Sequence, residues 1–199
     1  MSILDPSHVE DNPTRLKQLR NVRVLYFMYF ACFGLMSVYL NVYLLKMGLS
    51  GKQIGLTNSL ASLLGMLGSP IWAAISDRFG LRRMLMVINV AGAGVSALGL
   101  VFAGQFTALM FLTVANTFFV SSLLPLIDTM NLSALQGRPE LYGKQRAWGT
   151  VGYILATLGI GLLLGGMNLR LVFGVYAILM GGMLAFVWQL PNDAIRLTT

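Results

Sequence analysis

Six apolar segments, each long enough to cross a lipid bilayer as a helix, dominate this sequence of 199 residues. A bilayer span needs about 20 mostly apolar residues, and residues 22–45, 53–75, 84–103, 106–127, 147–166 and 171–190 meet that need. Apart from Arg23 near the start of the first, these segments contain no Lys, Arg, Asp or Glu. Hydrophobic residues make up 56% of the chain and charged residues 11%. A soluble domain of this length cannot bury so much apolar surface.

We therefore predict an all-α integral membrane protein with six transmembrane helices, because helices satisfy their own backbone hydrogen bonds in lipid. Helix ends extend beyond the apolar stretches, so the helices are expected at about 22–45, 53–75, 84–103, 106–135, 143–166 and 171–190. Residues 1–21 and 191–199 are expected to form short terminal tails.

The basic residues predict the orientation of the six spans. If the N-terminus is cytoplasmic, eleven basic residues lie on the inner side and three on the outer side. Such a bias is typical of a positive-inside topology. It accounts for the net charge of +7 without nucleic-acid binding, and it places both tails in the cytoplasm, with the protein in the cell membrane. The inner set is Arg15, Lys17, Arg20, Arg23, Arg78, Arg82, Arg83, Arg138, Lys144, Arg146 and Arg196, and the outer set is Lys46, Lys52 and Arg170.

Residues that would carry enzyme chemistry are scarce. His8 is the single histidine and lies in the N-terminal tail, whereas Cys32 is the single cysteine and lies inside the first span. No phosphate-binding loop, nucleophile–histidine set or metal-ligand cluster occurs. We expect no enzyme activity, no cofactor and no metal.

Proline and glycine predict where the helices bend and pack. Pro70 and Pro125 lie inside the second and fourth spans, and each is expected to bend or loosen its helix. Pairs of small residues such as Gly149 and Gly152 are expected to let helices approach closely. Gly-Lys-Gln occurs at 51–53 and again at 143–145. These tripeptides begin the second and fifth spans, as two inverted three-helix repeats would require.

The loop between the second and third spans holds a charged motif, Ser-Asp-Arg-Phe-Gly-Leu-Arg-Arg, at residues 76–83. A positive-inside loop explains its arginines but not an acid at the end of a span. The pattern resembles the loop signature of the major facilitator superfamily, with Ala73 and Leu81 as mild departures from it. This resemblance implies a cytoplasmic conformational gate formed by Asp77, Arg78, Gly80, Arg82 and Arg83.

A single acid and a single base flank the next inner turn. Asp128 and Arg146 each lie nine residues from Gly137, so an antiparallel hairpin brings both to about 13 Å from the turn. Burying an ionisable side chain in a membrane costs free energy, so such a residue marks a solute or ion pathway unless it only pairs with an opposite charge. Tyr153 follows Arg146 by seven residues, on the same helix face. Two interpretations stay open: a polyol-binding wall, or an ion pair that holds two helices together.

This stretch resembles the lactose permease-like branch of the superfamily, the sugar/proton symporters. That branch has an acid late in the fourth helix and then a Tyr/Phe-Gly-x-x-Arg-x-x-Gly-x-x-Gly-aromatic run. Here the acid is Asp128, eighteen residues before Arg146 as in the branch. The resemblance implies that Asp128 and Arg146 hold solute hydroxyls, that Tyr153 stacks on a ring, and that Tyr39 lines the cavity. The matching run is Tyr142, Gly143, Arg146, Gly149, Gly152 and Tyr153.

The resemblance implies the N-terminal half of a transporter that moves a small polar solute by alternating access. A sugar is the first candidate for this solute. Asp128 is the candidate for proton coupling. One half cannot enclose a solute, so we expect either a homodimer or a separate C-terminal half as partner in the lipid bilayer. An aromatic acid or nucleoside carrier is the alternative within the superfamily. A non-transporting six-helix assembly or regulatory module is the alternative of another class.

Overall fold

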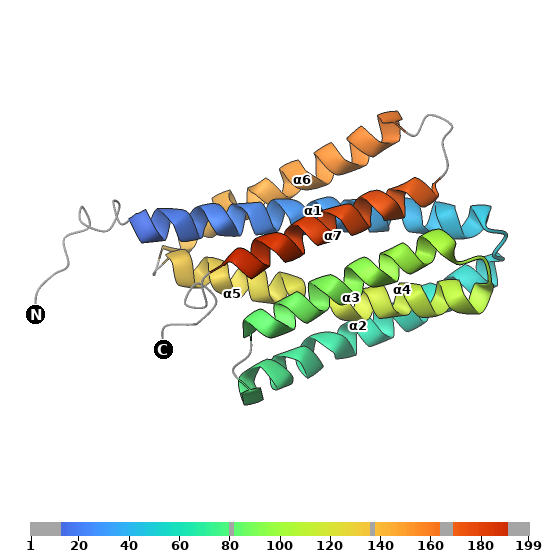
Figure 1. The fold of residues 1–199 in the computed structure, drawn as a ribbon, viewed down its shortest axis with the longest axis horizontal. Coiled ribbons are helices and arrows are strands. Elements are labelled where there is room, and N and C mark those ends of the chain that lie inside the picture. The colour runs from blue at the N-terminus through green and yellow to red at the C-terminus, as the bar shows by residue number, and fades with distance from the viewer. Residues whose placement is uncertain (1–12, 80–81, 136–137, 164–168, 191–199) are drawn as a thin grey trace, which may run out of the picture.

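A computed structural model describes residues 13–79, 82–135, 138–163 and 169–190 of the chain. All regular structure in these ranges is helical, and the long helices run side by side along one axis (Figure 1). Six of the helical spans are long and apolar enough to cross a membrane, which confirms the predicted class for the described residues. The elements are α1 (Pro13–Lys46), α2 (Gly51–Phe79), α3 (Arg82–Phe102), α4 (Phe106–Val120), α5 (Leu123–Leu135), the 3-10 turn η2 (Pro139–Leu141), α6 (Tyr142–Leu163) and α7 (Arg170–Gln189).

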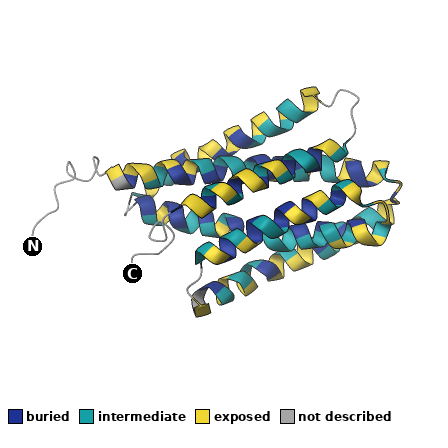
Figure 2. Cartoon of the chain, viewed as in Figure 1, coloured by how far each residue is buried: buried dark blue, intermediate teal, exposed yellow. Residues whose placement is uncertain are grey.

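The bundle is organised around α1 and α3. Helix α1 packs against α6, α7 and the short α5, while α3 packs against α4 and α7. Helices α6 and α2 lie at opposite sides of the bundle (Figure 1). The main core forms where α1, α3, α5 and α7 meet, around fully buried side chains such as Leu25, Tyr26 and Met86. Exposed residues lie along the outer faces of the helices (Figure 2). Many of them are large hydrophobic residues, as a lipid-facing or partner-facing surface requires.

The fourth span is interrupted inside the bundle, as Pro125 predicts. One membrane span covers residues Phe106 to Leu135. Within it, α4 ends at Val120 and α5 begins at Leu123. Proline has no N–H and its ring clashes with the carbonyl four residues earlier, here that of Ser121. The break therefore falls one turn before the proline itself. Pro70, in contrast, lies within the unbroken helix α2.

The first helix begins earlier than its apolar segment. Residues 13–21, expected as part of the tail, form the first turns of α1. Arg15 is buried, and its guanidinium donates to the carbonyls of Ala134 and Leu135 at 3.2 and 2.9 Å. These are the last carbonyls of α5, which have no partner within their own helix. A basic side chain there satisfies them and complements the helix dipole, so α1 and the end of α5 are held together.

Two glycines set the distance between α1 and α6. A side chain at Gly152 would collide with the backbone carbonyl of Phe27, and one at Gly149 would collide with the ring of Phe30. Both glycines are buried. They allow the two backbones to come closer than any larger residue would permit, which confirms the packing role predicted for this pair. Because Arg146 precedes them on α6, they also determine how near its side chain lies to α1.

Candidate functional site

The carboxylate of Asp128 lies where α5, α1 and α6 meet. Tyr26 of α1 donates its hydroxyl to Asp128 Oδ1 at 2.5 Å, and Tyr142 of α6 donates to the same oxygen at 2.9 Å. Asn131, one turn after Asp128, donates from Nδ2 to the Tyr26 hydroxyl at 3.2 Å. Three helices therefore supply a connected set of hydrogen bonds around one acid. Such charge-assisted bonds are stronger than bonds between neutral groups.

Arg146 joins this set through Tyr142. Its Nη1 donates to the Tyr142 hydroxyl at 2.9 Å. The guanidinium carbon lies 5.7 Å from the ring centre of Phe30 and 6.0 Å from that of Tyr142, both within the range of a cation–π contact. Arginine carries five N–H donors, and this is the one hydrogen bond that the described residues show for Arg146. Most of its donors are thus open to another group.

The structure brings Asp128 and Arg146 together, as the hairpin argument predicts, but not in direct contact. Within the described ranges they share no hydrogen bond or ion pair, and the Tyr142 hydroxyl bonds to both. The described residues therefore show no direct ion pair between the two helices at this point. A polar relay of carboxylate, phenol and guanidinium stands in its place.

Tyr153 and Tyr39 lie further along the contact between α1 and α6. The Tyr153 ring packs at 6.4 Å from Phe33, which itself stands next to Phe30. Tyr39 donates its hydroxyl to the backbone carbonyl of Thr157 at 2.8 Å. Tyr153 thus extends an aromatic row that starts beside Arg146. Tyr39 is used for helix packing and makes no hydrogen bond to the Asp128 set within the described residues.

The gate motif is only partly described. Gly80 and Leu81 lie outside the described residues, as does the side chain of Asp77 at the end of α2. Arg78 lies 5.8 Å from the ring centre of Phe79. Arg83 donates to the backbone carbonyl of Trp188 and lies over its indole ring, so it ties the start of α3 to the end of α7. Arg82 lines a cavity on the other side of α5.

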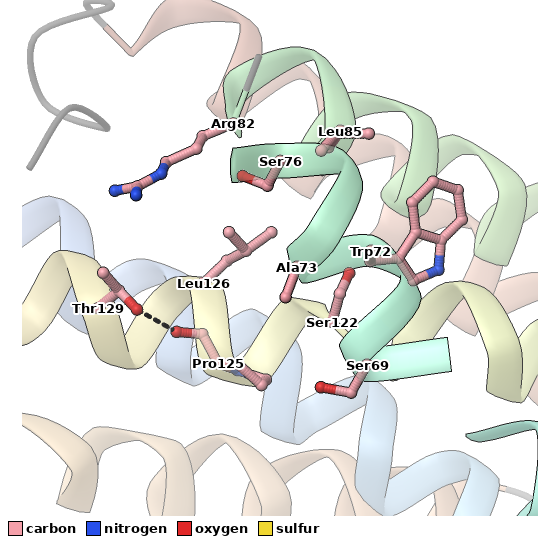
Figure 3. A pocket seen from close by; sticks show the side chains of 10 residues that line it. All are labelled: Ser69, Trp72, Ala73, Ser76, Arg82, Leu85, Ser122, Pro125, Leu126 and Thr129. Carbon is pink, nitrogen blue, oxygen red and sulfur yellow. Dashed lines mark hydrogen bonds between the residues drawn. The ribbon is translucent and has the colours of Figure 1, made fainter. Parts of the chain in front are cut away.

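That cavity lies between α2, α3 and α5 (Figure 3). Its volume is about 180 Å³. Ser76 is buried, and its hydroxyl makes no hydrogen bond within the described part of the chain. Helix α5 therefore separates this mostly apolar cavity from the Asp128 set. The lining residues are Ser69, Trp72, Ala73, Ser76, Arg82, Leu85, Ser122, Pro125, Leu126 and Thr129.

Sequence reasoning did not identify Tyr26, Asn131, Phe30 or the hydroxyl of Tyr142 as members of the site. Asn131 follows Asp128 by three residues and Tyr142 precedes Arg146 by four, so helical spacing places each on the face of its charged neighbour. Helical spacing alone could therefore have identified Asn131 and Tyr142 as members of the site. Nothing in the sequence marks Tyr26, which lies about a hundred residues from its partner and reaches it through helix packing alone.

Comparison with known proteins agrees with this architecture. The family described as "MFS_1 like family" matches residues 19–196, which is most of the chain. The chain belongs to the major facilitator superfamily. A solved structure of the nucleoside transporter NupG (D323A mutant) superposes with a TM-score of 0.80 at 20% sequence identity, over 87% of this chain and 44% of NupG. This likeness shows that the bundle has the fold of half a major facilitator transporter.

Curated relatives include a permease, a probable transporter of a different solute and a drug-resistance protein. The maltose permease of Geobacillus stearothermophilus is 27% identical over 170 residues, covering 85% of this chain and 43% of the permease. The probable 3-phenylpropionic acid transporter of Escherichia coli is 29% identical over 193 residues, covering 91% and 49%. The quinolone resistance protein NorA of Staphylococcus aureus is 27% identical over 187 residues, covering 90% and 47%. This major facilitator chain spans about half the length of these relatives.

Proposed function

We propose that this chain forms one half of a secondary active transporter that moves a sugar across the cell membrane by alternating access. The observation that carries the proposal is the relay of Asp128, Tyr142 and Arg146 at the meeting of α1, α5 and α6. Charged side chains at membrane depth are costly, and they mark solute or ion pathways when they face a cavity or a partner. The family supports a transport role, and a maltose permease is among the relatives.

The chemistry of the relay suits a polyol ring. The Asp128 carboxylate accepts hydrogen bonds from hydroxyl groups, and the planar Arg146 guanidinium donates to them. Phe33 and Tyr153 offer ring faces to the C–H side of a sugar along the same helix contact. Phe33 is 47% exposed, so its face is available to a solute. Asp128 is also the group that we assign to proton coupling, because it is the acid within the relay.

A complete pathway requires a second half. A single bundle leaves the relay on one wall of a cavity, whereas transporters of this superfamily bind solute between two halves. The start of α1 and the end of α7 lie at the same end of the bundle (Figure 1), so two copies can pair in parallel. We assign the second half to another copy of this chain or to a separate C-terminal half.

The proposed orientation places the ends of both terminal helices in the cytoplasm. It rests on the division of basic residues, eleven against three. Residues 76–83 then lie at the cytoplasmic face, where we assign Asp77, Arg78, Gly80, Arg82 and Arg83 to conformational gating rather than to solute binding. Cysteine scanning tests this topology: a membrane-impermeant thiol reagent added from outside should label a cysteine at Met47 and not one at Arg138.

A second candidate solute is an aromatic carboxylic acid. The observation that favours it is that Arg146 stacks on Phe30 without a direct ion pair to Asp128, which leaves donors for a solute carboxylate. A probable 3-phenylpropionic acid transporter is also among the relatives. The repulsion between Asp128 and a second carboxylate opposes this candidate. A nucleoside, with its ribose hydroxyls, remains a third solute class to test.

Uptake by proteoliposomes tests the proposed function. The full chain is reconstituted into lipid vesicles. Uptake of labelled maltose, 3-phenylpropionate and uridine by these vesicles is compared with uptake by empty vesicles, with and without a proton gradient. We expect saturable maltose uptake that the gradient increases. Uptake of the acid alone would replace the sugar by the second candidate. No uptake of any solute by particles whose mass equals two copies would favour a non-transporting assembly.

A further inference from the structure

The hydroxyl of Tyr142 occupies the space between the two charged groups that the proposed function assigns to the solute. It donates to Asp128 Oδ1 and accepts from Arg146 Nη1, each at 2.9 Å. A solute hydroxyl held by the same carboxylate and the same guanidinium would make the same pair of bonds, one given and one received. The phenol and such a solute hydroxyl therefore compete for one position.

The two tyrosines on Asp128 differ in how firmly they are held. Tyr26 is fully buried in the main core, and Asn131 also donates to its hydroxyl. Tyr142 is only partly buried and is the first residue of α6, directly after the 3-10 turn Pro139–Leu141. Gly143 follows it, and a β-carbon added there would meet no atom of the neighbouring elements within 4 Å. Helix ends with few packed neighbours open at low free-energy cost, so Tyr142 is the donor that can leave Asp128.

We propose that Tyr142 is a displaceable internal ligand: its hydroxyl holds the place of a solute hydroxyl between Asp128 and Arg146 and moves away when the solute binds. This inference rests on the proposed function and adds a criterion for the solute. A group that replaces the phenol must donate to Asp128 and accept from Arg146. Hydroxyl groups satisfy both charged residues, whereas a carboxylate satisfies Arg146 and leaves Asp128 without the lost donor.

Removal of the phenol oxygen alone should relieve this competition. Tyr142→Phe keeps the ring beside the Arg146 guanidinium and deletes the hydroxyl that must be displaced. When a binding-competent state is only a fraction of the population, apparent affinity falls by that fraction. We expect the Kd for maltose to fall on the order of tenfold in Tyr142→Phe, and the reactivity of Arg146 toward an arginine reagent to rise severalfold.

The experiment uses the purified full chain in detergent and two readouts. Equilibrium binding of labelled maltose gives Kd, and the rate of phenylglyoxal modification at Arg146, followed by peptide mass spectrometry, needs no solute. The matched control is Tyr43→Phe, which removes a phenol oxygen that donates to the Leu100 carbonyl at 2.6 Å in the second core cluster. This control should change neither the maltose Kd nor the Arg146 rate.

The readouts separate this inference from the proposed function. Tighter maltose binding with faster Arg146 modification supports both. If maltose binds neither wild type nor variant, the sugar assignment fails, and the Arg146 rate alone decides: a faster rate in Tyr142→Phe supports displacement. An unchanged Arg146 rate overturns the inference. Weaker maltose binding by Tyr142→Phe also overturns it, because the hydroxyl would then be a direct solute ligand.

Discussion

The hydroxyl of Tyr26 donates to the carboxylate of Asp128 at 2.5 Å, across the contact between the first helix and the second half of the fourth span. Tyr26 is completely buried, and its oxygen also accepts from Asn131 at 3.2 Å. A buried phenol with two partners has little freedom to rotate. It therefore holds Asp128 in one place, while Tyr142 donates to the same carboxylate oxygen and links it to Arg146.

Tyr26→Phe should destabilise the protein and weaken solute binding. A hydrogen bond to a charged group contributes about 1.5–3 kcal/mol, and its loss leaves Asn131 without an acceptor. Thermal unfolding in detergent and equilibrium maltose binding measure the two effects. Tyr29→Phe is the matched control, because the Tyr29 hydroxyl makes no hydrogen bond within the described residues and the same helix carries both tyrosines. Equal melting temperatures for the two variants would contradict the positioning role.

Asp128 and Arg146 should be coupled through Tyr142 rather than directly. A double-mutant cycle of Asp128→Asn and Arg146→Gln is expected to show a coupling of about 0.5–3 kcal/mol in unfolding free energy. In the Tyr142→Phe background the coupling should fall toward zero, because the shared hydroxyl is gone. Undiminished coupling in that background would indicate a direct ion pair.

Transport separates binding from helix clamping in the same cycle. The double variant lacks both the carboxylate and the guanidinium, so it cannot hold solute hydroxyls even where it regains stability. Uptake in proteoliposomes should therefore remain absent in the double variant. Restored uptake would refute the assignment of Asp128 and Arg146 to solute binding and leave only a structural role.

Gly152→Ala should separate α6 from α1. The new methyl group would collide with the carbonyl of Phe27, and overpacking of this kind costs about 1–3 kcal/mol. Because the shift moves Arg146 away from Phe30, uptake should fall with stability. Gly159→Ala on the same helix is the control, since its added carbon meets no atom within 4 Å, and it should change stability by less than about 1 kcal/mol. Similar losses for the two variants would argue against close packing as the cause.

Asp77→Asn should impair transport without weakening equilibrium binding. A gate residue changes the balance between conformations and makes no contact with the solute. Uptake in proteoliposomes should fall, whereas the maltose Kd in detergent should stay within about twofold of wild type, as for a residue with no solute contact. A parallel loss of affinity would place Asp77 in the binding site.

Local properties of the sequence were enough to predict the spans and the region of the site. The length and composition of each apolar segment identify a membrane helix because the bilayer sets one thickness for all of them. Pro125 predicts the interruption of the fourth span because the missing N–H and the ring clash act within one turn. Asp128 and Arg146 lie at the same depth because they are equally far from one turn and the rise per helical residue is constant.

Only the tertiary structure decided which side chains meet. The insertion of Tyr142 between Asp128 and Arg146, the contact of Tyr26 with Asp128, and the capping of α5 by Arg15 depend on how the helices are rotated and how closely they pack. Rotation about a helix axis follows from the sum of many weak contacts, such as those of Gly152 against Phe27, and no local pattern encodes it. The sequence therefore determined which charged residues would be near one another, and the packing of α1 against α6 decided through which hydroxyl they would interact.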